Sequence, residues 1–523
     1  MSKPSLLKSS LVVASMTFLS RILGFVRDVI FARIFAASPE MDAFLIAFKI
    51  PNFMRRLFAE GAFNQAFVPT IGETKATEDK EHVKDLIAHV SGTLGGYLLI
   101  ITAIGMMLAP ILVMIFAPGY AFNDENTSQY ELTIELLRVT YPYIFFISLV
   151  AFAGGILNTY GEFALPAFTP VILNIVLISS ALFLAPMMEE PIMALAIGVF
   201  IAGLCQLLLQ IPFLAKKGLL VRPQWNRQHS GVRKILKLML PALFGASISQ
   251  ISLLLDIMLA SLLVSGSISW LYYSDRLMEF PLGILGVALA TVILPALSKD
   301  HHSESKVAFS RTLDKALRWA VYLGIPSAIG LFLLSVPIIA TLFGSEQFQR
   351  NDILMSSYGL MAYSFGLVGF ILVKVLLPAY YSRQDTKTPV KIGIISLSVG
   401  MFFNLIIVLP WYFSGAVGAH AGLAIATSLS AIINALLLYR GLITSEIYIP
   451  QPGWRKVFVQ IGVSTSLMIF TLLCLNTSIN YWLNLDAWGQ VYLLLGWIGI
   501  AAFIYLATLW LMGVKLSYFY RKG

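Results

Sequence analysis

Nine basic side chains lie inside long apolar runs of this chain, where an isolated charge is costly to keep. They are Arg21, Arg27, Arg33, Lys49, Arg55, Arg56, Arg138, Arg276 and Lys374. A charge within a bilayer costs a few kcal/mol or more, so such residues usually face a watery cavity, a partner or a substrate path. Arginine offers a planar, permanently protonated fork that matches phosphate oxygens. The set therefore predicts an anionic ligand, although a residue near a span end, such as Arg33, is explained by snorkelling.

Acidic residues stand beside two of these arginines and predict charge pairs. Asp28 directly follows Arg27. Asp275 precedes Arg276, and Glu279 follows Arg276 at the three-residue spacing at which helical side chains meet. We expect an ion pair between Arg276 and Glu279 that holds a gate, and we expect Asp28 to hold an arginine until an anionic ligand displaces it.

A second set of charges surrounds Pro51. Asp42 and Glu60 are also expected to pair with arginines in the ligand-free protein. Ideal helical geometry puts both acids on the face of Arg56, which favours Arg56 over Arg55 as the ligand-facing residue. A kink at Pro51 would change which side chains share a face before and after it, and would favour Arg55 instead. The spacing alone leaves both arginines open.

The elements that must position these side chains are membrane-spanning helices. The chain has 523 residues, of which 58% are hydrophobic and only 12% are charged, far from the composition of a soluble domain. A helix needs about 20 apolar residues to cross a bilayer, and such runs recur throughout. The sequence predicts an all-α polytopic membrane protein with about fourteen spans, near 11–36, 41–70, 86–116, 132–158, 165–187, 190–214, 235–264, 268–297, 316–343, 354–380, 388–412, 416–439, 456–476 and 488–514.

The loops between these runs differ sharply in charge. One alternating set carries 26 of the 36 Lys and Arg residues, including those from Lys216 to Arg233 and from Arg383 to Lys387, whereas the opposite set holds only Arg350. Basic loops stay in the cytoplasm. We therefore predict that both chain ends are cytoplasmic, that the loops 118–130 and 477–487 are periplasmic, and that the net charge of +9 orients the protein rather than binding nucleic acid.

The order of the spans predicts two similar halves followed by an addition. The second and eighth spans both end in a similar phrase, with Pro69 and Pro295 at corresponding places. This repeat favours two six-span lobes, 1–217 and 218–445, an arrangement common among transporters. Apart from Lys456 at the first boundary, the two spans within 446–523 contain no Asp, Glu, Lys or Arg, so they are expected to form an apolar groove.

One acidic residue stands apart from the arginines. Asp256 lies in the seventh span among leucines, where it is either a hydrogen-bonded residue that holds helices together or a site for Na⁺ or a proton. A carboxylate with amide and hydroxyl oxygens suits Na⁺, and Asn404, Thr427 and Ser428 are candidate partners. No other metal and no cofactor is expected. The chain has no P-loop, no HExxH motif and no nucleophile–base spacing, so it is not expected to be an enzyme.

Four runs of residues resemble a known family across essentially the whole chain. They are Ser20–Asp28, Asp42–Phe44 with Pro51–Phe63, Tyr273–Pro281 and Tyr381–Pro389. These runs are similar to the signature of the MurJ (MviN) family of lipid II flippases, part of the multidrug/oligosaccharidyl-lipid/polysaccharide exporter superfamily.

The resemblance implies a specific activity. It implies two six-helix lobes around a central cavity, worked by alternating access, that flip lipid II from the inner to the outer leaflet of the bacterial cytoplasmic membrane for peptidoglycan synthesis. It implies that Arg21, Arg27, Arg55 and Arg276 bind this undecaprenyl-diphosphate-linked glycopeptide, and that the last two helices take its polyprenyl tail. Membrane lipids and cell-wall synthesis proteins are the expected partners, and Na⁺, H⁺ or the membrane potential is the expected driving force.

Three other readings compete with this one. A multidrug exporter of the same superfamily would need an acidic and aromatic cavity for its cationic substrates, so the arginines count against it. A flippase for another polyprenyl-diphosphate glycan is disfavoured only by the family motifs. A structural scaffold leaves the nine basic residues within spans unexplained.

Overall fold

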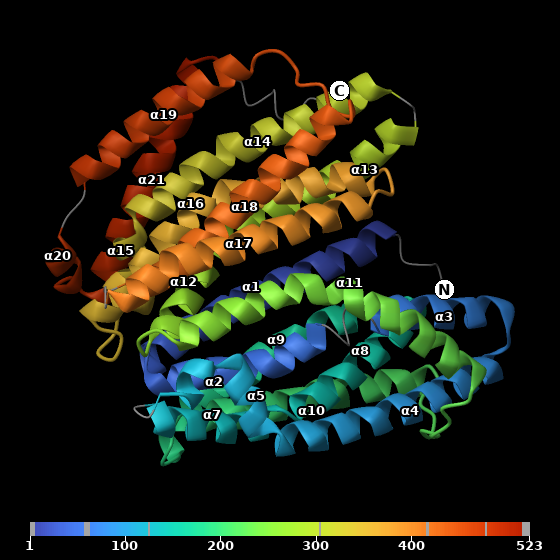
Figure 1. Cartoon of the computed structure of the whole chain (residues 1–523). Helices are drawn as coiled ribbons and strands as arrows, with labels where there is room; N and C mark the ends of the chain where they lie inside the picture. The colour runs from blue at the N-terminus through green and yellow to red at the C-terminus, as the bar shows by residue number, and fades with distance from the viewer. Residues whose placement is uncertain are drawn as a thin grey trace. The chain divides into compact units, whose positions relative to one another are not determined.

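The computed structural model describes residues 6–56, 63–123, 126–302, 305–414, 418–475 and 478–514, and these are almost entirely helical (Figure 1). Each of the fourteen predicted spans falls on one helix or on successive helices. Ten helices in the described part are long and apolar enough to cross a membrane. The prediction of an all-α polytopic membrane protein is confirmed, and the exact number of fourteen spans stays a prediction.

The chain divides into two compact units, Met1–Ser269 and Trp270–Gly523. Unit 1 contains α1 (Leu6–Phe35), α2 (Pro39–Met54), α3 (Asn64–Thr77), α4 (Lys80–Met107), α5 (Ala109–Phe116), α6 (Pro118–Ala121), α7 (Thr127–Thr140), α8 (Tyr143–Thr159), α9 (Ala164–Ser179), α10 (Met193–Lys216) and α11 (Ser230–Ser261). α12 (Ser267–Pro281) begins at the division. Unit 2 continues with α13 (Val287–His302), α14 (Lys306–Leu333), α15 (Ser335–Phe343), α16 (Arg350–Tyr381), α17 (Lys387–Phe413), α18 (Ala419–Thr444), α19 (Trp454–Leu475), α20 (Ile479–Leu483) and α21 (Ala487–Leu511).

Short polar side chains mark where several helices begin. Ser38 accepts a hydrogen bond from the backbone N–H of Met41 at the start of α2, and Pro39 occupies its first turn. Asp79 does the same for His82 at the start of α4. Such caps satisfy backbone donors that the first turn of a helix leaves over.

Unit 1 packs around an aromatic core. α1 lies against α9, α2 against α7, and α10 against α8 and α9. Phe67 stacks on Phe63 with ring centroids 5.0 Å apart and lies 4.9 Å from Phe152, joining α3 to α8. α11 packs on α3, α4, α5 and α6. These contacts place α11 in unit 1. The sequence instead predicted that α11 belongs to the second lobe, which was expected to begin at residue 218. The boundaries of the lobes stay a prediction.

Unit 2 has α16 at its centre. α16 packs against α14 and α18, and α17 lies beside α18, drawn in yellow-green to orange in Figure 1. α19 and α21 pack on each other, and α19 also contacts α14. The two added helices are therefore attached to unit 2.

The second and eighth predicted spans are both interrupted. α2 and α3 are separated by a stretch in which residues 55, 56 and 63 are π-helical. α12 and α13 are separated by the π-helical turn η5 (Leu282–Gly286). Such turns break the regular hydrogen-bond ladder and often occur at functional sites. Pro69 and Pro295, the shared phrase of the sequence, lie inside the helices that follow.

Candidate functional site

A buried ion pair between consecutive residues lies in the second half of α1. Arg27 is 6% exposed and Asp28 is fully buried. The Nε and Nη2 atoms of Arg27 donate to Oδ1 of Asp28, at 3.0 and 2.7 Å, and the guanidinium lies over the ring of Phe31. In this state Asp28 occupies the edge of the guanidinium that a phosphate would use.

A residue from another helix completes this pair. Nη1 of Arg27 donates to Oδ1 of Asn174 in α9 at 3.0 Å. Asn174 in turn donates from Nδ2 to the backbone carbonyl of Ser20, also at 3.0 Å. The cluster of Arg27, Asp28 and Asn174 thus fastens α1 to α9. Arg21 lies on the same helix, but its side chain is exposed.

The structure differs from the prediction for Asp42. Its carboxylate accepts hydrogen bonds from the backbone N–H of Gly266 at 2.7 Å and of Ser269 at 2.8 Å, and from the Ser269 hydroxyl. Among the described residues these donors, not an arginine, hold Asp42. The reason is the start of α12, whose free N–H groups and dipole attract an anion. Asp42 therefore ties α2 to the beginning of α12.

The remaining basic residues of this region are less enclosed. Arg55 is half-buried and donates from Nε to Oδ1 of Asn52 at 3.2 Å, and Arg56 is exposed. Glu60 lies outside the described residues. The choice between Arg55 and Arg56 as ligand stays open.

Arg276 in unit 2 forms the predicted ion pair. Its Nη1 lies 3.0 Å from Oε2 of Glu279, three residues along α12. Its Nη2 donates to the hydroxyl of Tyr272 at 3.3 Å, and its guanidinium lies over the ring of Tyr272. Asp275 is half-buried. Both of these partners, Glu279 and Tyr272, lie on α12.

The residues of the predicted cation site belong to different units. Asp256 is half-buried on α11 in unit 1. Asn404 on α17 is 5% exposed, and Thr427 on α18 donates its hydroxyl hydrogen bond to the carbonyl of Leu423. Ser428 donates to the carbonyl of Ala362. The cation site stays a prediction.

Sequence reasoning missed the residue that attaches α19. Asp314 on α14 is buried and accepts hydrogen bonds at Oδ1 from Tyr448, from the backbone of Gln451 and from the indole of Trp454. Its Oδ2 lies 2.6 Å from Nε of Arg318. The spacing of Asp314 and Arg318 is visible in the sequence, but their partners are more than 130 residues away.

A second polar chain joins both added helices to α14. The hydroxyl of Tyr322 donates to Gln460 on α19 at 2.6 Å, and Gln460 donates to the carbonyl of Met512 after α21. Tyr505 on α21 donates to the carbonyl of Tyr322 at 2.7 Å. Outside these contacts the helices present exposed apolar side chains, among them Phe458, Phe470, Tyr492, Phe503 and Trp510. A polar attachment thus leaves the apolar faces free.

Comparison with known proteins identifies the family. The family model described as lipid II flippase MurJ matches residues 31–492. A Haemophilus influenzae protein named probable lipid II flippase MurJ is 46% identical over 97% of this chain and 100% of its own length. A Burkholderia cenocepacia protein named lipid II flippase MurJ is 40% identical over 99% of this chain and all of its own length.

Solved structures agree with this assignment. A structure described as lipid II flippase MurJ in an inward closed conformation has a TM-score of 0.79 at 28% identity and covers 95% of this chain and 98% of its own. An inward-facing multidrug transporter of the MATE family shares the fold, with a TM-score of 0.66, at only 14% identity. The signature runs, the two helical units and these matches over nearly the whole chain agree, and the chain belongs to the MurJ family of lipid II flippases.

Proposed function

We propose that this chain flips lipid II from the inner to the outer leaflet of the bacterial cytoplasmic membrane by alternating access. The observation that carries the proposal is the 46% identity to a protein named for this activity, over 97% of this chain and the whole of that relative. A multi-span protein with arginines inside its helices fits a substrate whose charged diphosphate cannot cross hydrocarbon unaided.

The arginines of unit 1 are proposed to bind the diphosphate. Arg21 is exposed and makes the first contact. Arg27 then exchanges Asp28 for a phosphate oxygen, because both are anionic acceptors that fit the same edge of the guanidinium. This exchange moves the guanidinium of Arg27 and so loosens its bond to Asn174, which fastens α1 to α9. Arg55 and Arg276 are proposed to bind anionic parts of the substrate as well.

Asp42 is proposed to act as a latch. Its bonds to Gly266 and Ser269 are short and buried, so they hold the start of α12 against α2. Any movement of the start of α12 away from α2 breaks these bonds. The loop charges support an orientation with both chain ends in the cytoplasm.

The exposed apolar faces of α19 and α21 are proposed to carry the polyprenyl tail. Phe458, Phe470 and Phe503 offer a surface that a long hydrocarbon can follow. Polar substitutions there should slow a long-tailed substrate most. If a short-tailed analogue were slowed equally, the tail would have to bind elsewhere.

Energy coupling is proposed to involve Asp256, the acidic residue of α11. The variant Asp256→Asn should lose any dependence of flipping on Na⁺ or on the proton gradient while keeping its fold. Unchanged flipping with an unchanged Na⁺ response would remove Asp256 from the coupling step.

Two experiments test the function. Depletion of the protein in cells should cause lipid II to accumulate on the inner leaflet; accumulation of a different polyprenyl-diphosphate glycan would instead assign that substrate. In vesicles containing purified protein, Arg21→Lys, Arg27→Lys and Arg276→Lys should each reduce lipid II flipping severalfold, because lysine keeps the charge but loses the fork. Arg33→Lys, an exposed arginine on the same α1 helix, is the matched control. Full activity in all three variants would contradict the arginine role.

A further inference from the structure

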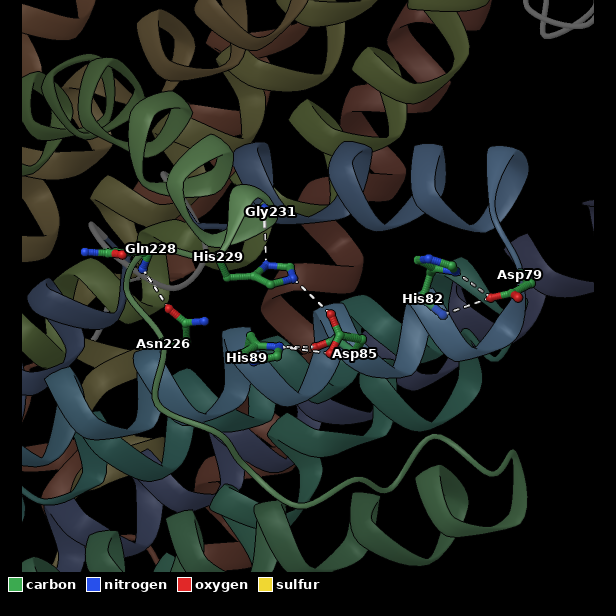
Figure 2. Close-up of polar contacts among 8 residues, drawn as sticks. All are labelled: Asp79, His82, Asp85, His89, Asn226, Gln228, His229 and Gly231. Carbon is green, nitrogen blue, oxygen red and sulfur yellow. Dashed lines mark hydrogen bonds and ion pairs between the residues drawn. The ribbon is translucent and has the colours of Figure 1, made fainter.

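Two histidines and an aspartate meet on the surface of unit 1, outside every residue assigned above. Asp85 and His89 stand four residues apart on α4, and His229 directly precedes α11. Figure 2 shows both imidazoles directed toward the Asp85 carboxylate. One ligand atom of each residue lies within 4.8 Å of the others. We propose that Asp85, His89 and His229 bind a divalent transition metal, with Zn²⁺ as the expected ion.

The distances are close to those that coordination requires. Nε2 of His229 lies 2.9 Å from Oδ2 of Asp85, and Nδ1 of His89 lies 3.2 Å from Oδ1. Zinc binds nitrogen and carboxylate oxygen at about 2.0–2.2 Å, so tetrahedral donor atoms lie roughly 3.3 Å apart. The two rings are parallel within 8°, with centroids 4.5 Å apart. Side-chain rotations that turn these stacked rings toward each other would bring all three ligands onto one ion.

The donor set selects the class of metal. Two imidazoles and one carboxylate suit Zn²⁺, Cu²⁺ and Ni²⁺, whereas Mg²⁺ and Ca²⁺ prefer oxygen alone. The side chains of His89 and His229 are 13% and 20% exposed, and that of Asp85 is 52% exposed. The site is thus open on the carboxylate side, where solvent can complete the coordination shell.

Metal binding exchanges existing hydrogen bonds. Nδ1 of His229 accepts from the backbone N–H of Gly231 at 3.2 Å, so the ring proton is on Nε2 and points to Asp85. Nδ1 of His89 faces the backbone carbonyl oxygen and the Oδ1 atom of Asp85. Both oxygens are acceptors, so this nitrogen also carries a proton. Each neutral ring binds the ion when this proton moves to its other nitrogen. The exchange gives up the bond to Gly231 and places a charge of +2 beside Asp85.

The site joins a linker to a helix. The segment before α11 already runs along α4, where Gln224 donates its backbone N–H to the carbonyl of Ala88 at 2.9 Å. The backbone N–H of Asn226 donates to the hydroxyl of Thr93, and the ring of Trp225 lies 5.1 Å from that of Tyr97. A metal on His229 adds a third fastening at the point where α11 begins. Zinc is therefore expected to hold this linker against α4.

The test uses the full-length protein, purified without a histidine tag and stripped with a chelator. Zn²⁺ alone is titrated against a fluorescent chelator, and Cu²⁺ is added separately for EPR. We expect one tight site, with hyperfine structure from two imidazole nitrogens. His89→Gln and His229→Asn should each weaken binding roughly tenfold or more; the asparagine retains an acceptor for capping α11. Size-exclusion profiles and helix content serve as checks that these variants fold.

His82 provides a matched control. It lies on the same helix, 2.8 Å from Asp79 and visible in Figure 2, without belonging to the three-residue cluster. His82→Gln should leave Zn²⁺ affinity unchanged. Equal affinity in wild type, His89→Gln and His229→Asn, or an equal loss in His82→Gln, would overturn the metal site.

The fastening is tested separately by trypsin, because Arg227 is exposed in the linker and is followed by Gln228. Zn²⁺ should slow cleavage after Arg227 severalfold in the wild type but not in His229→Asn. Tight binding without such protection would overturn the fastening while leaving the metal site.

Discussion

Arg27 and Asp28 hold two opposite charges inside unit 1, so neither side chain can be removed alone without leaving its partner buried. Arg27→Ala should destabilise the protein by about 3–5 kcal/mol, because it leaves Asp28 as an uncompensated buried charge. The thermal unfolding temperature in detergent measures this loss. Arg21→Ala, on the same helix but exposed, should leave that temperature nearly unchanged.

A double variant separates charge from packing. Arg27→Met combined with Asp28→Asn removes both charges and keeps most of the volume, so it should regain much of the stability lost in Arg27→Ala. A double variant as unstable as the single one would show that the contacts with Asn174 and Phe31, rather than the charge pair, dominate.

Asp385 should make the stability depend on pH in the acid range. It lies between α16 and α17, and the backbone N–H of Thr388, which donates to its Oδ1 at 3.0 Å, holds the pKa of this carboxyl below its usual 3.8. A lowered pKa in the folded state stabilises the protein above the unfolded pKa, and this contribution disappears as pH falls through the folded value. The difference in unfolding temperature between the wild type and Asp385→Asn should therefore be constant above about pH 5 and shrink as the pH falls from the unfolded pKa through the lower folded pKa. A difference that did not change with pH would contradict the assignment.

Whether the partner of a charged residue could be predicted depended on how far apart the two residues lie in the sequence. The pair Arg276–Glu279 followed from helical spacing alone, because both residues lie on one turn of α12. Asn174 binds Arg27 across 147 residues, and Ser269 binds Asp42 across 227. No periodicity in the sequence identifies such partners. Asp42 was assigned to an arginine because the sequence shows charges but not which helix begins beside them.

At the scale of elements, the linker before α11 depends on the absence of a side chain at Gly96. A Cβ atom there would lie 2.0 Å from the ring of Trp225, whereas one at Gly95 would meet nothing within 4 Å. Gly96→Leu should therefore displace the linker and increase trypsin cleavage after Arg227 severalfold. Gly95→Leu makes the same chemical change on the same helix and should leave cleavage at the wild-type rate. Equal cleavage in both variants would show that the linker does not depend on this contact.

Asp314 makes a second prediction for elements, since it attaches α19 to α14. Asp314→Ala leaves the donors of Tyr448 and Trp454 without their shared acceptor. It should cost about 3 kcal/mol or more, because a buried charge-assisted network is broken. The thermal unfolding temperature checks this. Trp454→Phe removes one donor and keeps the ring, so it should cost about 1–2 kcal/mol; a larger loss than in Asp314→Ala would refute the central role of the carboxylate.

The helices themselves were largely predictable, because an apolar run of about 20 residues has the length that a helix needs to cross the bilayer. Their interruptions were not. Pro51 indicated a kink in the second span, but the π-helical residues 55 and 56 follow it. The turn η5 comes directly after Pro281, and neither break has a distinct composition.

At the scale of the whole molecule, the loop charges predict which ends of the helices face the cytoplasm. In intact cells, a cysteine placed at Arg227 should resist a membrane-impermeant thiol reagent, whereas one placed at Ser478 should react. Cys205 and Cys474 are replaced first, since Cys474 is exposed. Labelling at position 227 from outside would reverse the proposed orientation.

The fastening of α11 at both ends has a mechanical consequence. His229 bonds to Asp85 just before its start, and at its end the hydroxyl of Ser261 accepts from the backbone of Gly119 at 3.2 Å. A helix of 32 residues is about 48 Å long, so turning it by about 1° around one end moves the other by about 0.8 Å. A hydrogen bond of 2.9 Å does not survive that displacement. Release of the bond at one end would therefore let α11 tilt about its other end, and a tilt of about 1° would move the released end by about 0.8 Å.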